Sequence, residues 1–203
     1  MRRYAHMLLA GAVLVGTGLP AVARPFKITN DVHTLNNVSF FSKATLVTIK
    51  GQTDQVVGMA DVNMDNLGAT SGSIKVDLHA LDTGIAKRNE HMQGVLETDK
   101  YSYADFKPTR IIAPAKKPVA NKPMTVTIEG TMTLHGITKP MKTQATITYL
   151  PEQDKDYRPG DWFQLETTFH LKLSDYGIVA PKLVPMKVSD DLAIALTVMA
   201  KGQ

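Results

Sequence analysis

The sequence predicts an all-β fold, an antiparallel barrel or sandwich of about eight strands. Three observations lead to this class. Apolar and polar residues alternate with a period of two along much of the chain, as in strands with one buried face. Turn-forming pairs such as Lys50-Gly51 and Ser71-Gly72 separate these stretches at hairpin spacing. Closure into a barrel would remove exposed sheet edges, which favours the barrel.

The first 23 residues are interpreted as a signal peptide and set apart from the fold. A basic start with Arg2 and Arg3 precedes an apolar run at 7–19, and Ala21-Val22-Ala23 supplies a small-x-small cleavage site. The run is shorter than the roughly 20 residues that a membrane-spanning helix needs. We therefore expect a mature domain of residues 24–203, periplasmic or secreted, that does not span the membrane.

The expected strands follow one another along this domain. Their ranges are 38–50, 55–64, 73–81, 104–112, 125–134, 141–149, 163–173 and 192–200. The alternation is clear in 125–134, where threonines occupy the polar face, and strong in 163–173. The last strand is apolar on both faces, which is typical of a strand that is covered on both sides or lies against a ligand.

One segment departs from the alternation and predicts a helix. Residues 86–101 carry Met92, Val95 and Leu96 at helical spacing, with charged residues elsewhere and Gly94 as a weak point. We expect this short helix to lie across one end of the barrel. The proline- and lysine-rich residues 113–123 are expected to form an exposed connection.

A histidine, a threonine and lysines stand close together in GTMTLHGITKPMK, residues 130–142. Strands are expected on both sides of this stretch. Glycine tolerates positive φ and proline has a fixed φ, and both are typical of connections. We therefore interpret His135-Gly136-Ile137-Thr138-Lys139-Pro140 as a hairpin connection rather than a catalytic loop.

Charge, cysteine content and motifs narrow the function classes. Of 23 Lys and Arg residues, Arg2 and Arg3 belong to the expected signal peptide, which leaves 21 against 19 acidic residues. This near balance argues against a nucleic-acid partner. The sequence has no cysteine and no zinc, phosphate-loop or nucleophile-elbow motif. We assign no catalytic or metal-binding residue, although a Ser-His-Asp arrangement could still assemble in space.

The stretch at 130–141 resembles the G-x-L-T-h-x-G-V-T-K-P-V element of the YceI-like family of exported proteins. Other stretches resemble further elements of that family in the same order. They are Val32-His33-Thr34 with Val38-Ser39-Phe40, Leu81-Asp82-Thr83-Gly84 with Arg88-Asn89-Glu90-His91-Met92, Tyr103-Ala104-Asp105-Phe106, and Ser174-Asp175-Tyr176-Gly177-Ile178. These elements span nearly all of the mature domain, so the resemblance concerns the whole fold.

The chain departs from the family pattern at three places. Asn89 stands where an aspartate is usual, and Leu173 stands where an arginine is common. Lys50-Gly51-Gln52 replaces a longer R-G-x-F pattern in the first hairpin. Head-group contacts would be expected at these positions, so the departures bear on the identity of a ligand more than on the fold.

The resemblance implies a lipocalin-like, eight-stranded antiparallel barrel whose interior takes up a polyisoprenoid, quinone, fatty amide or similar long amphiphile. Polar groups at the mouth of such a site orient the head group, and we assign this role to Arg88, Asn89 and His91. Apolar side chains would line the path of the tail. They are Phe40, Val126, Ile128, Met132, Leu134, Phe169 and Leu171.

Several alternatives stay open from the sequence. Arg88 and His91 could instead pair locally and tie the helix to the barrel rim. The ten methionines fit either an adaptable wall or a filled core. For the whole molecule, the alternatives to a lipid carrier or store are a hydrolytic enzyme and a packed extracytoplasmic interaction module without ligand. No cofactor is expected besides a bound isoprenoid or quinone-like lipid, and a homodimer is left open.

Overall fold

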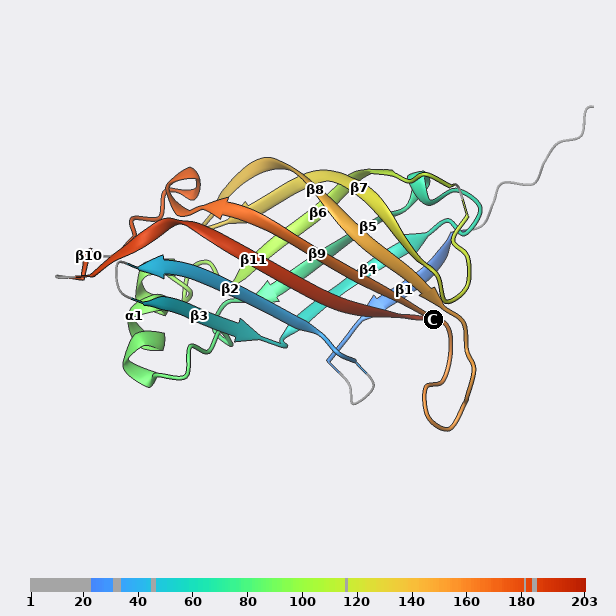
Figure 1. The fold of residues 1–203 in the computed structure, drawn as a ribbon, viewed down its shortest axis with the longest axis horizontal. Coiled ribbons are helices and arrows are strands. Elements are labelled where there is room, and N and C mark those ends of the chain that lie inside the picture. The colour runs from blue at the N-terminus through green and yellow to red at the C-terminus, as the bar shows by residue number, and fades with distance from the viewer. Residues whose placement is uncertain (1–22, 31–33, 45–46, 116, 181, 184–185) are drawn as a thin grey trace, which may run out of the picture.

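The structure is a computed structural model that describes residues 23–30, 34–44, 47–115, 117–180, 182–183 and 186–203. In Figure 1 these residues form one β-barrel with α-helix α1 (Ala86–Leu96) beside one end. The expected signal peptide lies outside the described residues except for Ala23. Val32 and His33 of the first family element lie outside them as well.

The strands and short helical turns are distributed along the whole domain. The strands are β1 (Arg24–Ile28), β2 (Asn37–Ala44), β3 (Thr48–Thr53), β4 (Val56–Val62), β5 (Ser71–Asp77), β6 (Tyr103–Ile112), β7 (Pro123–Leu134), β8 (Ile137–Leu150), β9 (Trp162–Lys172), β10 (Lys182–Leu183) and β11 (Met186–Gly202). Two 3-10 turns are η1 (Leu67–Ala69) and η2 (Leu173–Tyr176).

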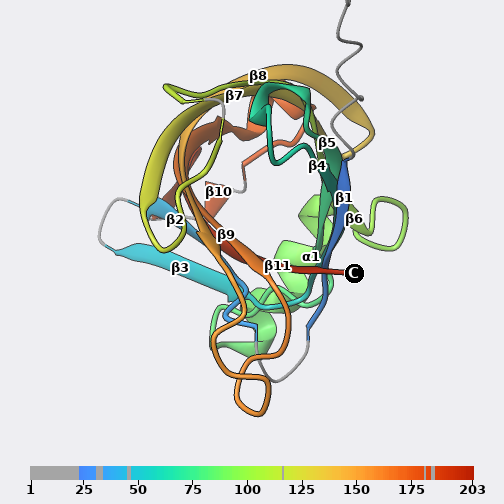
Figure 2. The same cartoon turned by 90° about the vertical axis from the view of Figure 1, so that its right-hand side faces the viewer.

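Eight strands close the barrel, as predicted. The hydrogen-bonded order is β1-β4-β5-β6-β7-β8-β9-β11, and β1 pairs with β11 to complete the ring seen in Figure 2. All of these pairings are antiparallel. Closure supplies hydrogen-bond partners to both edges of the strands and so removes exposed edges from the ring.

Strands β2 and β3 form a hairpin that leaves the ring. One edge of β11 is shared, because its residues 188–197 pair with β2 and residues 200–202 pair with β1. At the other edge of β3, Gln52 and Asp82 exchange two backbone hydrogen bonds of 2.9 and 2.8 Å. The hairpin therefore extends the barrel wall only at the end where α1 lies.

The predicted strands correspond to observed ones, with corrections to one strand and two turns. Ser71-Gly72, expected as a turn, begins β5, where Gly72 pairs with Ala60. Residues 38–50, expected as a single strand, contribute to both β2 and β3, so that prediction is wrong. Lys50-Gly51, expected as a turn, lies inside β3, where Gly51 pairs with Phe40. β1 and the two-residue β10 were not predicted, because each is too short for an alternating pattern to stand out.

The predicted helix is confirmed and is shorter than expected. α1 ends at Leu96 because Glu97 adopts the left-handed conformation, with φ of 47°. The Thr98 N–H then donates to the Gln93 carbonyl at 3.1 Å, a hydrogen bond typical of a C-cap after which the chain leaves the helix. The expected apolar side chains of the helix, including Met92, are half-buried.

The residues between β7 and β8 form the predicted hairpin connection, but it is shorter than expected, because residues 137–140 already pair within β8. His135 and Gly136 have φ of 51° and 75°, and type I′ turns require positive φ at both positions. His135 Nδ1 lies 3.1 Å from the Tyr176 carbonyl oxygen, and its ring lies 4.6 Å from the Tyr101 ring. A Cβ on Gly136 would lie 2.7 Å from that same tyrosine ring. The turn is therefore fixed by packing against its neighbours.

The barrel interior is filled unevenly. At the end formed by β1 and the last residues of β11, the Phe26 and Phe163 rings meet edge to face at 5.0 Å, and Tyr149 lies 5.2 Å from Phe163. We call the buried cluster around these rings the packed core. Its members are Phe26, Ile28, Val38, Val56, Val62, Leu67, Val76, Val126, Ile128, Ala145, Ile147, Phe163, Val198 and Ala200.

Asp161 links three segments beside the packed core. Its carboxylate accepts from Arg24 Nη2 at 2.9 Å, from the Tyr149 hydroxyl at 3.0 Å and from the Glu152 N–H at 3.1 Å. Burial raises the pKa of Asp161, but these donors outweigh it and hold the pKa below its ordinary value. The carboxylate thus stays charged and ties β1 to β8.

Phe26→Ala tests the role of the packed core. Phe26 is fully buried, and removing a buried phenylalanine ring costs about 3–5 kcal/mol. We expect a loss of that size in the free energy of unfolding measured by urea titration. Val57→Ala is the control, because Val57 is 45% exposed and such changes stay within about 0.5 kcal/mol. Equal losses in both variants would contradict a core centred on Phe26.

Candidate functional site

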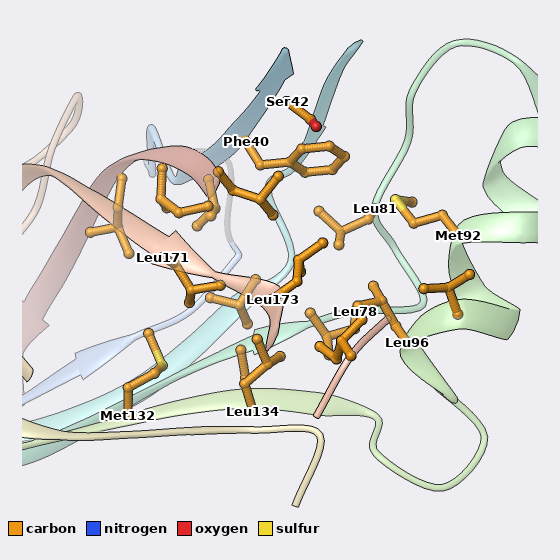
Figure 3. A pocket seen from close by; sticks show the side chains of 18 of the residues that line it. Phe40, Ser42, Leu78, Leu81, Met92, Leu96, Met132, Leu134, Leu171 and Leu173 are labelled. Carbon is orange, nitrogen blue, oxygen red and sulfur yellow. The ribbon is translucent and has the colours of Figure 1, made fainter. Parts of the chain in front are cut away.

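A cavity of about 860 Å³ occupies the barrel between the packed core and α1. Figure 3 shows leucine, methionine and phenylalanine side chains that point into it from several strands and from the helix. It reaches the rim of the barrel, where Lys87, Glu90 and His91 also border it. A space of this size is within the range of sites for small molecules, which are mostly apolar and concave.

The alternation of the strands puts apolar side chains on the cavity wall. On β9, Leu165, Thr167, Phe169 and Leu171 border the cavity, while the residues between them face outward. β7, β8 and β5 contribute in the same way. Leu192, Ile194 and Leu196 come from β11, the strand whose second apolar face had indicated cover or a ligand. The wall is therefore a direct result of period-two patterning.

Phe40 lies flat on the wall because of a glycine opposite it. In the register of β2 and β3, Phe40 pairs with Gly51. A Cβ on Gly51 would lie 2.2 Å from the Phe40 ring. The glycine thus lets the ring rest on the backbone of β3 and keeps it out of the centre of the cavity.

The floor of the cavity is the near side of the packed core. Val38, Val76 and Ile128 belong to the packed core and also border the cavity. Phe106 packs against them, and a Cβ on Gly130 of β7 would lie 2.8 Å from its ring. A guest that enters from the end with α1 would therefore meet a closed floor, and could not pass through the barrel.

The helix forms the side of the cavity at the rim. Met92, Val95 and Leu96 of α1 border the cavity, yet no residue of the helix is fully buried. A helix of this length is marginal by itself in water. Its position is held by polar contacts such as Gln93 Nε2 donating to the His79 carbonyl at 3.0 Å.

Several of these polar contacts join the loop before α1 to the first turn of the helix. Arg88 donates to the Thr83 hydroxyl at 2.9 Å and to the Thr83 carbonyl at 2.6 Å. Asn89 Oδ1 accepts from the Thr83 N–H and hydroxyl, and Asn89 Nδ2 donates to Asp82 at 2.7 Å. The hydrogen bond from Asn89, followed by that from the Gly84 N–H, lowers the pKa of Asp82.

These contacts bear on the residues that the sequence had assigned to a head group. Arg88 and His91 border the cavity, whereas Asn89 does not. The Arg88 and Asn89 side chains are used within the protein, which agrees with the alternative of a local tie between helix and rim. Of the three, His91 is exposed at the rim.

Six of the seven residues proposed for the tail come together on the cavity wall. They are Phe40, Ile128, Met132, Leu134, Phe169 and Leu171. The seventh, Val126, also points inward but lies in the packed core, 2% exposed and away from the cavity lining. Alternation identifies the inward face of β7, but it does not say how far along the barrel the filled part extends.

Two further observations concern other kinds of site. In the part of the chain that the structure describes, no group of three or more His, Cys, Asp or Glu side chains is arranged to hold a metal ion. Within the same residues, no helix has the length and apolar character needed to cross a membrane.

Comparison with known proteins decides the family. The model of the YceI-like domain matches residues 29–200 of the chain. The chain belongs to the YceI-like family. The family resemblance of the sequence elements is thereby confirmed.

Relatives of this YceI-like chain are distant in sequence. A UPF0312 protein of Vibrio cholerae is 29% identical over 132 residues, which cover 64% of this chain and 65% of the relative's own length. A UPF0312 protein of Pseudomonas putida is 28% identical over 134 residues, with the same shares covered. The match thus spans slightly less than two thirds of either relative.

Solved structures share the fold at lower identity. A polyisoprenoid binding domain from Saccharophagus degradans, implicated in plant cell wall breakdown, matches with a TM-score of 0.67 and 19% identity, over 90% of this chain and 99% of that domain. BcnA of Burkholderia cenocepacia matches with a TM-score of 0.62 and 18% identity, over 82% and 96% of the two chains. At these identities the likeness shows that the YceI-like barrel is shared.

The Asp82 contacts predict a pH effect at the rim. Because the pKa of Asp82 is below its ordinary value of 3.8 in the folded protein, unfolding takes up a proton between the two values. The stability from this carboxylate is fully present above pH 3.8 and is lost as the pH falls through the folded value. In urea titrations at neutral and acidic pH, Asp82→Asn should therefore lose less stability on acidification than the unmodified protein. Parallel pH profiles would contradict this assignment.

Proposed function

We propose that the protein is an exported lipid-binding protein, which holds the tail of a long isoprenoid or similar amphiphile in the cavity as a carrier or store. The observation that carries the proposal is the cavity of about 860 Å³ and its predominantly hydrocarbon wall. The polyisoprenoid binding domain from Saccharophagus degradans has the same fold and supports the same class of ligand. Polyprenyl lipids, quinones and fatty amides all fit this description.

The size of the cavity agrees with one long chain. At ~30 Å³ per water-sized group, about 860 Å³ holds on the order of thirty such groups. Each buried methylene gains about 0.8 kcal/mol on leaving water. A long hydrocarbon chain in water is therefore stabilised by a site that shields it from the solvent, and the hollow end of the barrel provides such a site.

The barrel wall fits a flexible guest better than a rigid one. Met92, Met132 and Met141 border the cavity, and methionine side chains adapt their shape to what they contact. The cavity also supports a ligand-binding function over the alternative of a packed module without ligand.

The contacts of the described polar residues favour binding over hydrolysis. His170 Nδ1 lies 3.0 Å from Asp191, while the Ser174 hydroxyl donates to Asp190 at 2.6 Å. The imidazole and the hydroxyl thus bond to two different carboxylates instead of to each other. A serine activated by a histidine requires a hydrogen bond between them, so this cluster is a tie between β9, η2 and β11.

Narrowing the cavity should weaken lipid binding. Leu171→Trp places a large ring in the cavity, whereas Thr168→Trp places it on the exposed face of the same strand. Native mass spectrometry of protein purified from its own host should show bound lipid in the unmodified protein and the Thr168 variant, and a smaller lipid-bound fraction in the Leu171 variant. A lipid at one hundred times its Kd should raise the free energy of unfolding by about 2.7 kcal/mol. Absence of lipid and of thermal stabilisation in all three proteins would refute the proposal.

Export is tested separately from lipid binding. Residues 1–23 are proposed to direct the chain out of the cytoplasm, with cleavage before Arg24. We expect N-terminal sequencing of protein from the periplasmic or culture fraction to begin at Arg24. Recovery of the full chain from the cytoplasm alone would contradict export and would leave the cavity assignment intact.

A further inference from the structure

Ser42 is a buried hydroxyl on the wall of the cavity. It lies on β2 and is 2% exposed. Its Oγ has no hydrogen-bond partner among the described residues, although the residue borders the cavity. Figure 3 shows its oxygen next to Phe40, two residues earlier on the same strand. Buried polar atoms are nearly always hydrogen-bonded, so an unpaired one on a cavity wall needs an explanation.

The other hydroxyls on the wall have partners within the protein. The Thr83 hydroxyl bonds to Asn89 and Arg88. Thr143 and Thr167 lie 3.0 Å apart through their hydroxyl oxygens, and Thr167 donates to the Gln144 carbonyl at 2.7 Å. Among the described residues whose hydroxyl groups border the cavity, Ser42 is therefore the one whose hydroxyl has no partner within the protein.

Four titratable residues border the cavity at its rim. Arg88 donates to Thr83, and Lys87 forms an ion pair of 2.7 Å with Glu90, whereas His91 is exposed at the rim. Two other buried polar atoms of the described residues have no hydrogen-bond partner, Asp105 Oδ1 and His135 Nε2, but neither residue borders the cavity. On the described strands that form the wall, Ser42 is thus the polar side chain without a hydrogen-bond partner.

We propose that Ser42 binds the head group of the lipid, and that this head group is neutral: a hydroxyl, a carbonyl or an amide. The inference rests on the proposed lipid-binding function and narrows it. A serine hydroxyl both donates and accepts, so it can pair with each of these groups. A phosphate or diphosphate beside Ser42 would put charge among apolar side chains, and the cations at the rim already have contacts within the protein, Lys87 with Glu90 and Arg88 with Thr83, so a charged head group is disfavoured.

Three probes with tails of similar length test the assignment. They are geranylgeraniol, geranylgeranyl diphosphate and the hydrocarbon phytane, each measured by displacement of a fluorescent lipid from the full mature chain. The unmodified protein should prefer the alcohol to the diphosphate. Ser42→Ala should weaken binding of the alcohol about tenfold, which is the scale of one net hydrogen bond. Phytane should bind the variant as well or better, because no buried hydroxyl is left unpaired.

Ser39→Ala is the matched control. Ser39 lies on the same strand and is buried, but it does not border the cavity and its hydroxyl donates to Asn37 at 2.8 Å. It should keep the preference for the alcohol over phytane, whatever it costs in stability. Ser42→Cys, a change of similar size with a weaker donor, should give an intermediate preference and guards against misfolding of the alanine variant.

The outcomes separate the two proposals. An unchanged preference for the alcohol over phytane in Ser42→Ala would overturn the role of Ser42 and leave lipid binding standing. Tighter binding of the diphosphate than of the alcohol would overturn the neutral head group. Failure of every probe to bind the unmodified protein would count against the lipid-binding function itself.

Discussion

The structure depends on how side-chain volume is distributed along the barrel axis. A closed ring of eight strands encloses an interior of limited width, which side chains can fill completely or leave partly open. At one end, aromatic rings such as Phe26 and Phe163 meet across the interior and leave no room. At the other end, side chains such as Met132 and Leu171 stay on the wall. The hollow and its closed floor both follow from this difference.

Much of the fold could be predicted from the sequence, because the physical signals are local. Alternation on β7 and β9 identifies both the strand and its inward face, and positive φ at His135-Gly136 agrees with a two-residue turn. β1 was missed because RPFKI is short and its pairing partners are distant in the chain. The sequence predicts one strand over 38–50 because residues 44–47, Ala-Thr-Leu-Val, contain no turn-forming residue. It predicts a break at Lys50-Gly51 because sequence alone does not distinguish a glycine that packs against a ring from a glycine in a turn.

The candidate site was predictable in outline only. A period of two assigns Val126 and Ile128 to the same face, but one lies within the packed core and the other reaches the cavity floor. Polar side chains on the predicted helix indicated Arg88 and Asn89, whose partners in the preceding loop could be found only in three dimensions. Ser42 left a fainter signal, a polar residue in an inward row with Val38 and Phe40. Whether such a hydroxyl is paired cannot be decided without coordinates.

The way β11 shares its edge has a mechanical consequence. Where β11 no longer pairs with β1, it pairs with β2, so the β2–β3 hairpin continues the wall near α1. Among the described residues, this hairpin is joined to the next part of the wall by the two backbone hydrogen bonds between Gln52 and Asp82. Separating Gln52 from Asp82 breaks two hydrogen bonds, at a net free-energy cost of about 1–3 kcal/mol. Splitting a full ladder between two ring strands would cost several times more. The wall beside α1 is therefore held together at this join by fewer backbone hydrogen bonds than the ring strands around the packed core, so local separation there costs less free energy than opening the ring.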